Sequence, residues 1–349
     1  MSVHPGDLAP APALAFSPRG PLSAAITAVL TDGTAPPTDL PGRARTAAAG
    51  RDVLVDDDVQ LALFLLYALS YGSLDGRGAE WEWSAPLIEA RTALEGAFEA
   101  ALREQVATPP LPPPRSADVA RALFDLTAMA DGPSLARYAA KAATLDQLRE
   151  FLVHRTVYTL READSYSWAI PRLTGRAKAA LVEIQADEYG GGDPERVHAT
   201  LFARAVRGVG LDDRYAHYLD HVPTLTLTSH NVQSLFGINR RLLGALVGHL
   251  AAFEMTSSIP NRFYADAFRR HGFGADVTEY FDEHVEADAV HEQIAAHDLA
   301  GSLAQDDPAL VGDIMFGAAA CVALDEWVGE HLLSAWRAGR SALRAPLER

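Results

Sequence analysis

The chain has 349 residues, of which 48% are hydrophobic and 22% are charged, and its formal net charge at pH 7 is -16. This length and composition allow a large buried core and are typical of a soluble globular protein. This strongly negative net charge argues against a surface of clustered Lys and Arg. We therefore expect no nucleic-acid partner. The single cysteine, Cys321, lies in an apolar run, which predicts a buried, inert thiol and excludes a disulfide framework within the chain.

The N-terminal residues do not resemble a secretory signal. Prolines at positions 5, 10, 12 and 18 interrupt their apolar character, and a signal needs a continuous apolar stretch behind a basic one. No run approaches the roughly 18 apolar residues that suggest a membrane span. We therefore expect a cytoplasmic protein with no membrane partner.

The first third of the chain is predicted to contain an arm and then a helical segment. Residues 1–50 are rich in Pro, Ala, Gly and Thr, which predicts an irregular N-terminal arm with one short helix. The acidic residues Asp56, Asp57 and Asp58 favour a helix start, and an apolar helix is expected to continue over residues 59–70. A second helix is predicted over residues 86–106, before a proline-rich connector at 109–114. These two helices of the segment 51–114 are the candidate interface of a homodimer.

From residue 115 to 349 nearly every segment is predicted to be helical, in a single domain. Thr144 and Gln147 form a capping-box pattern ahead of a helix that runs to about residue 163. Pro171 suits the first turn of the next helix, which ends at three glycines, and Asp193 and Pro194 begin another. Further helices are predicted over residues 228–257, 261–271, 275–303 and 308–343. Without convincing period-two strands or solenoid repeats, the fold class is all-α, a multi-helix bundle with an N-terminal helical extension.

Three potential metal ligands share one face of the predicted helix 275–303. His284, Asp288 and His291 stand at positions i, i+4 and i+7, which places them within roughly a 60° arc at about 100° per residue. A solvated polar face is the alternative, because Asp282 and Glu283 belong to the same helix. The spacing alone does not decide between these interpretations.

Acids on otherwise apolar helix faces favour the metal site. Glu162 and Glu254 each follow an apolar stripe, and a carboxylate at such a position must be paired, protonated or metal-bound because burying an isolated charge is costly. Glu188 and His198 add a fourth element. Ten residues of regular helix span roughly 15 Å, so the glycines at 190–192 must let the chain fold back if His198 is to reach the same site.

Together these residues provide oxygen and imidazole donors without a thiolate. Such ligation on facing helices suits a pair of iron or manganese ions, because softer metals favour sulfur; zinc would need fewer ligands. Arg240, Arg241 and Arg262 flank Glu254 in the sequence and are candidate clamps for a substrate carboxylate. Their alternative role is to cap a helix or form surface ion pairs.

The order and spacing of these donors resemble the heme-oxygenase-like di-iron oxidases and oxygenases over roughly residues 115–340. The resemblance rests on Glu162, Glu188, His198, Glu254 and the pattern His284-x-x-x-Asp288-x-x-His291. It implies a heme-oxygenase-like bundle in which these seven residues bind two iron ions without heme. It also implies O2 as co-substrate and an external electron donor. Glu254, the third carboxylate, marks the N-oxygenating branch of the family and is implied to be catalytic.

The resemblance therefore implies N-oxygenation of an amine of an amino acid or a related small metabolite in a biosynthetic pathway. One alternative is a di-iron desaturase or C–C lyase that acts on an amino acid or fatty acid. Another is a metal-free helical hydrolase or an interaction protein on the same scaffold. The hydrolase predicts a catalytic cysteine, and Cys321 has no histidine or carboxylate companion near it in the sequence.

Overall fold

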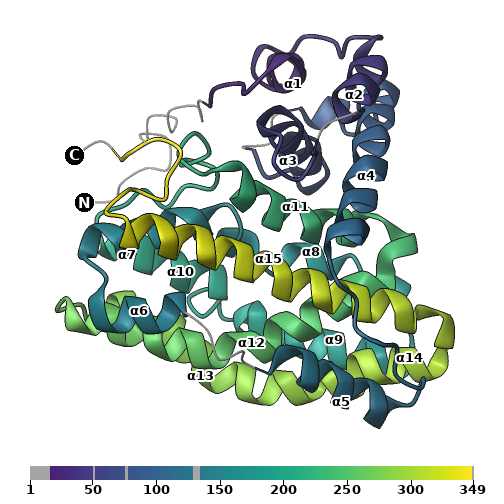
Figure 1. Cartoon of the computed structure of the whole chain (residues 1–349). Coiled ribbons are helices and arrows are strands. Elements are labelled where there is room, and N and C mark those ends of the chain that lie inside the picture. Colours follow the sequence, from purple (N-terminus) through teal and green to yellow (C-terminus); the bar gives the residue numbers. More distant parts are fainter. Residues whose placement is uncertain (1–15, 50–51, 75–77, 129–133, 348–349) are drawn as a thin grey trace, which may run out of the picture.

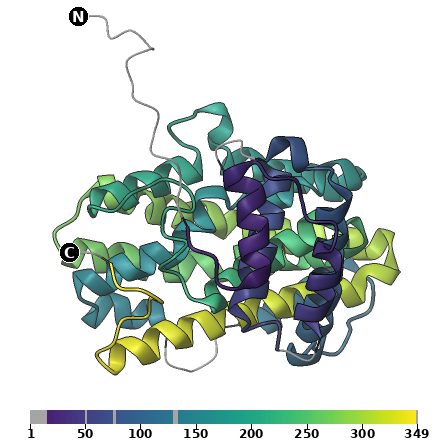
Figure 2. The same ribbon diagram turned by 90° about the horizontal axis from the view of Figure 1, so that it is seen from above.

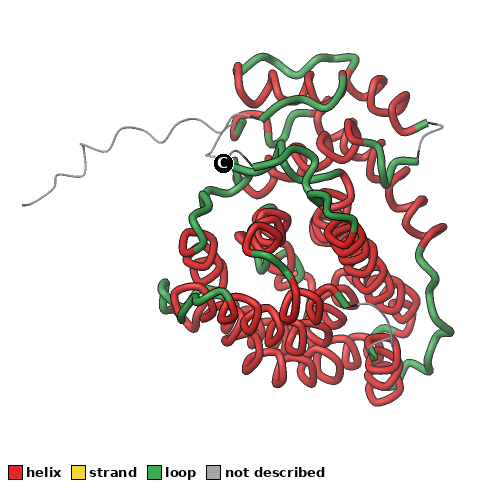
Figure 3. Tube along the Cα trace, turned by 60° about the vertical axis from the view of Figure 1, so that its left-hand side comes forward, coloured by secondary structure: helices red, strands yellow, loops and turns green. Residues whose placement is uncertain are grey.

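The computed structural model describes residues 16–49, 52–74, 78–128 and 134–347, except for the side chains of 286, 288 and 289. Within these ranges the chain forms helices and loops and contains no strand (Figure 3). The predicted all-α class is confirmed.

The described part of the predicted N-terminal arm contains two helices, α1 (Pro21–Asp32) and α2 (Leu40–Ala48). The prediction of an irregular arm is therefore wrong over residues 16–49, whereas residues 1–15 lie outside the described part. The N-terminus of α1 is capped by a distant residue, because the Asp58 carboxylate accepts hydrogen bonds from the backbone N–H groups of Leu22 and Ser23 at 2.9 and 2.7 Å. Such a cap leaves no local signal in the sequence.

Helices α3 (Asp57–Tyr71) and α4 (Ala85–Gln105) lie close to their predicted positions. The Asp56 side chain caps α3 by accepting from Asp58 and Val59 N–H. Every residue of α3 from 59 to 69 is buried, and its neighbours are α1, α4 and α11 (Thr224–Ile238) of the same chain (Figure 1). Helix α3 therefore has no face left for a dimer partner, which corrects that part of the predicted interface. The homodimer itself and the domain boundary at residue 114 stay predictions.

The rest of the chain forms the bundle that positions the candidate site. Its longer helices are α5 (Ser116–Thr127), α6 (Leu135–Ala142), α7 (Leu145–Thr156), α9 (Gly175–Glu188), α10 (His198–Gly208), α12 (Leu243–Arg270), α13 (Ala275–Gln293) and α15 (Val311–Arg337). The capping box of Thr144 and Gln147 begins α7 as predicted. The predicted helix 228–257 is instead divided between α11 and α12, and α12 continues through Pro260.

Helix α12 is the central helix of the bundle and packs against both α13 and α15. Figures 1 and 2 show α15 along one side of the bundle and the N-terminal helices α1 to α4 across its top. Two glycines let α12 and α15 approach closely. A Cβ at Gly248 would lie 1.9 Å from the Ile314 carbonyl oxygen, and one at Gly317 would lie 1.9 Å from that of Ala245. This contact buries the apolar faces of both long helices.

Two stretches, Arg240–Arg270 and Pro308–Arg337, are long and apolar enough to cross a membrane by length and composition alone. In this fold, 61% of the most apolar 18-residue part of the first stretch and 56% of that of the second are buried. A core helix of a soluble protein has the same composition, so this finding is weak evidence for a membrane span.

Three buried histidines that are not among the predicted ligands make stability depend on pH. Burial lowers the pKa of His230 to about 4 and that of His249 to about 3. Burial, with a contribution from His331, lowers the pKa of His154 to about 3. Below about pH 6.5 these histidines bind protons in the unfolded chain but not in the folded one, so their contribution to stability is complete above that pH and falls as the pH drops.

We expect His230→Phe to lose less stability in acid than the wild type. Between pH 7.5 and 5 the single His230 costs the wild type about 2 kcal/mol of unfolding free energy, and the variant lacks this cost. Urea unfolding of both chelator-treated proteins at the two pH values measures the difference. An equal loss in both proteins would show that His230 does not stay neutral in the folded chain.

Candidate metal centre

The structure brings six of the seven predicted ligands together in two groups that share one residue. Within each group, one donor atom from each residue lies within 4.8 Å of all the others. The first group is Glu162, Glu188, His198 and His284, and the second is Glu188, Glu254 and His291. All six side chains are buried. The shared Glu188 places the two groups side by side.

Five segments of the bundle supply these donors. Glu162 lies between a 3-10 turn and the short helix α8 (Asp164–Ser167). Glu254 lies on α12, and His284 and His291 lie on α13. Glu188 is the last residue of α9 and His198 is the first residue of α10. The predicted fold-back between them is confirmed, although α10 begins at His198 and not at Asp193.

In the first group, hydrogen bonds fix both the acid and one imidazole. His284 Nδ1 donates to the Tyr280 carbonyl oxygen at 2.7 Å, which turns His284 Nε2 toward Glu162 Oε1 at 3.2 Å. The Tyr280 hydroxyl donates to Glu162 Oε2 at 3.1 Å. Glu188 Oε2 and His198 Nδ1 lie 3.0 Å apart, yet neither buried atom has a hydrogen-bond partner among the described residues. These two orphaned atoms are suited to a shared cation.

In the second group, His291 lies between two acids. Its Nδ1 lies 3.2 Å from Glu254 Oε2, and its Nε2 lies 3.0 Å from Asp187 Oδ2. Asp187 is largely exposed and was not among the predicted site residues, although it directly precedes Glu188. A carboxylate behind a ligating imidazole fixes its tautomer and orientation. Asp187 is therefore placed to leave the Nδ1 lone pair of His291 available to a metal.

The electrostatics of both groups favour a bound cation. Burial by itself would lower the pKa of His198, but the nearby Glu188 and Glu162 raise it to about 9. For His291 burial also acts to lower the pKa, whereas Glu254 and Asp187 raise it to about 9. Protons on these imidazoles therefore neutralise part of the acid cluster, and a divalent cation could replace them.

The donor set itself fits iron. Among the described residues, no Lys or Arg forms an ion pair with Glu162, Glu188 or Glu254. Three buried carboxylates a few ångströms apart need cations nearby, because an uncompensated buried charge is costly. Oxygen and imidazole donors without sulfur suit iron or manganese. The residues present therefore fit two such ions.

The remaining predicted site residues are not part of the two groups. Asp288 belongs to α13, but its side chain lies outside the described part. Arg240, Arg241 and Arg262 are exposed, and Arg241 forms an ion pair with Glu99. Arg241 precedes Glu254 by about 20 Å of helix, so it does not reach the centre. Arg262 lies on the same helix as Glu254, and its side chain is exposed.

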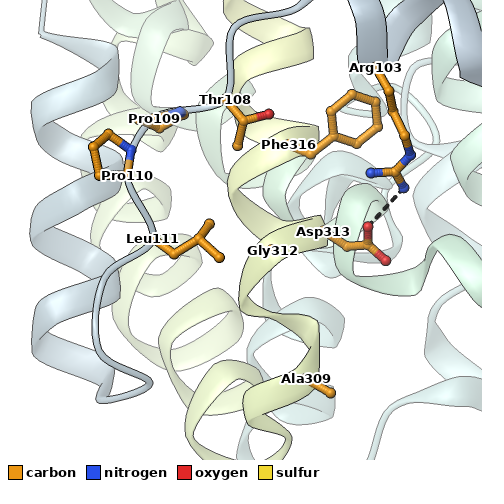
Figure 4. A pocket seen from close by; sticks show the side chains of 9 residues that line it. All are labelled: Arg103, Thr108, Pro109, Pro110, Leu111, Ala309, Gly312, Asp313 and Phe316. Carbon is orange, nitrogen blue, oxygen red and sulfur yellow. Dashed lines mark hydrogen bonds and ion pairs between the residues drawn. The ribbon is translucent and has the colours of Figure 1, made fainter.

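A surface pocket of about 670 Å³ lies away from the centre, between the proline-rich connector and the start of α15 (Figure 4). It contains none of the six donors. Its two charged residues, Arg103 and Asp313, satisfy each other in an ion pair of 2.8 Å. This pocket therefore offers no unpaired charge for a ligand.

Comparison with known proteins agrees with this centre. The chain is 31% identical over 148 residues to nitrosourea synthase from Streptomyces achromogenes subsp. streptozoticus, a match that covers 42% of this chain and 31% of that relative. The chain thus spans less than a third of that protein. Residues 149–326, just over half of the chain, match the model of the iron-containing redox enzymes, and they include all six clustered donors. With its all-helical fold, the chain belongs to this heme-oxygenase-like family of iron-containing redox enzymes.

Proposed function

We propose that the chain is a non-heme di-iron oxygenase that N-oxygenates an amine of an amino acid or a related small metabolite. The observation that carries this proposal is the sharing of Glu188 by two buried carboxylate and histidine groups. A carboxylate can bridge two ions through its two oxygens. Glu162, His198 and His284 would complete the first site, and Glu254 and His291 would complete the second, with Asp288 as a further predicted ligand.

Two ferrous ions held there would supply the electrons for O2 reduction, and an external donor would restore them. The chain's own residues would bind and orient the ions, and they would exclude water from the centre. Tyr280 holds Glu162 in place through its hydroxyl, and Asp187 can hold the Nε2 proton of His291. The burial of all six donors keeps bulk water from the centre.

Two observations support nitrogen as the oxidised atom. Glu254 is a third buried carboxylate in the centre, and its negative charge beside the second site would alter how O2 reacts there, which is why it is the proposed catalytic residue. The name of the relative, nitrosourea synthase, refers to a product that contains an oxidised nitrogen. The physiological substrate and reductant are part of the proposal.

The test begins with protein loaded anaerobically with ferrous iron and then mixed with ¹⁸O₂. A panel of L-amino acids, their decarboxylated amines and medium-chain fatty acids is supplied, and products are analysed by mass spectrometry. We expect a product with ¹⁸O bound to nitrogen, and Glu254→Gln should lower its yield by at least about tenfold, a typical effect of removing one charged group from a reacting centre. Glu183→Gln, which changes an exposed acid on α9, is the matched control.

Other outcomes would identify the alternatives. A desaturated or shortened product without ¹⁸O on nitrogen would replace N-oxygenation by the desaturase or lyase reaction. A chain that binds no iron would overturn the di-iron centre and leave the metal-free hydrolase or interaction protein. An unchanged product yield in Glu254→Gln would remove the catalytic role of Glu254.

A further inference from the structure

Gln185 is a buried polar residue of α9, one turn before Glu188, and it is only 3% exposed. Its Nε2 donates to the Ala163 carbonyl oxygen at 2.9 Å and to Ser167 Oγ at 2.8 Å. Since a carbonyl oxygen can only accept, the amide must face Ala163 with its nitrogen. The Gln185 side chain therefore links the end of α9 to the segment that contains Glu162 and α8.

This link joins two acids that come from different segments. Glu162 directly precedes Ala163, whereas Glu188 ends α9 and is followed by three glycines with φ of +71°, +61° and +92°. Glycine is the most permissive residue of the backbone, so the chain after Glu188 constrains its position weakly. Helix α9 itself packs mainly against the helical residues Ile294–Gly301. Its connection to the Glu162 segment therefore depends on side-chain hydrogen bonds.

Stability alone does not account for an amide at this position. Gln185 Oε1 is buried without a hydrogen-bond partner among the described residues, and a half-satisfied buried amide costs folding free energy. The two acceptors do not depend on Gln185 either. The Ala163 carbonyl also accepts from the Ser167 backbone N–H at 3.3 Å, and Ser167 Oγ also lies 3.1 Å from the Tyr189 hydroxyl. An apolar side chain of similar length should therefore fold about as well, which points to a role of the amide in function.

We propose that Gln185 is a positioning residue, which holds Glu188 at the separation from Glu162 that the metal centre needs. Its side chain leaves the turn of α9 that ends at Glu188, and it is bound to the backbone next to Glu162. The two carboxylates are thus held in place before a metal binds, which lowers the cost of ordering them around the ion. Because both groups share Glu188, a displacement of this residue affects both ions. This inference rests on the proposed di-iron centre.

Gln185→Met tests this role, because methionine has a similar length but no amide and adapts its shape to its surroundings. We expect the variant to bind ferrous iron about 10- to 100-fold more weakly than the wild type, as is usual when a group that orients metal ligands is removed. The melting temperature of the chelator-treated variant should equal or exceed that of the wild type, because the unpaired Oε1 is gone. Anaerobic titration against a competing coloured chelator measures the affinity.

Gln60→Met is the matched control, because Gln60 is a fully buried glutamine of α3, a helix that supplies none of the six donors. Both ends of its amide are satisfied. Its Nε2 donates to the Val53 carbonyl oxygen at 2.7 Å, and its Oε1 accepts from the Asn231 side chain at 2.8 Å. This variant deprives both partners of a hydrogen bond, so it should melt at a lower temperature. It should nevertheless bind iron with the affinity of the wild type.

Cobalt provides a second readout that does not depend on turnover. The visible absorption of protein-bound Co²⁺ depends on the number and geometry of its ligands. We therefore expect a changed cobalt spectrum in Gln185→Met and the wild-type spectrum in Gln60→Met. A residue that merely contributes to stability would leave this spectrum unchanged in the folded protein.

The results decide between positioning and structure. An iron affinity and a cobalt spectrum of Gln185→Met that match the wild type would overturn this inference. Failure of Gln185→Met to fold, or a melting temperature lowered as far as that of Gln60→Met, would also overturn it by making Gln185 a structural residue. If the wild type itself binds no iron, the di-iron proposal fails together with this inference. If the wild type binds two ions and Gln185→Met binds them equally well, only this inference fails.

Discussion

Glu188→Ala is expected to lose most of the iron from both sites. We expect about two ions per chain in the wild type, because the six clustered donors form two groups and, together with the predicted ligand Asp288, exceed the six positions of one octahedral ion. Glu188 is the only residue common to both groups. Without it the second group retains only Glu254 and His291 among the described residues, and the first retains three donors. His291→Ala, by contrast, changes only the second group and should retain about one ion per chain.

Iron content after anaerobic loading and desalting, measured by plasma emission, gives these numbers. The melting temperature with and without chelator provides a second readout, because an ion that binds only the folded chain stabilises it. We expect a large chelator effect in the wild type and little in Glu188→Ala. Glu183→Ala, on the exposed side of the same helix, should match the wild type. Two retained ions in Glu188→Ala would exclude the shared-ligand arrangement.

The sequence predicted the helices that carry strong local signals. The capping box of Thr144, the acidic start of α3 and the glycine break after Glu188 are all local, and each agrees with the structure. The structure differs from the prediction where the decisive contact comes from a residue far away in the sequence. Helix α1 is capped by Asp58, and α12 passes through Pro260 because its packing with α13 and α15 outweighs one missing hydrogen bond.

The candidate site follows the same division. The ligand-type residues could be recognised because an acid or histidine on an apolar helix face is conspicuous, and their spacing carried the family resemblance. Asp187 could not, because an exposed acid has no unusual pattern, although its position next to Glu188 was a weak signal.

Gly190→Ala is expected to remove the first iron site while sparing most of the second. Gly190 has φ +71°, and a Cβ there would lie 2.6 Å from the Val197 backbone nitrogen and 2.7 Å from the Arg196 carbonyl carbon. Backbone atoms cannot move aside as a flexible side chain can, so the segment before His198 must shift. Metal sites tolerate ligand displacements of only about 0.2 Å. We therefore expect about one ion per chain instead of two, and O2 consumption reduced by at least about tenfold.

Gly191→Ala is the matched control, because it separates backbone strain from the clash. Gly191 also has a positive φ, +61°, but a Cβ there would meet no atom within 4 Å. Both variants incur the cost of a left-handed alanine, about 1 to 2 kcal/mol, so both should lower the melting temperature of the chelated protein. Only Gly190→Ala should also lose iron, because only there does the new methyl group press on the backbone that carries His198. Equal iron contents in the two variants would mean that the position of His198 does not depend on the close approach at Gly190.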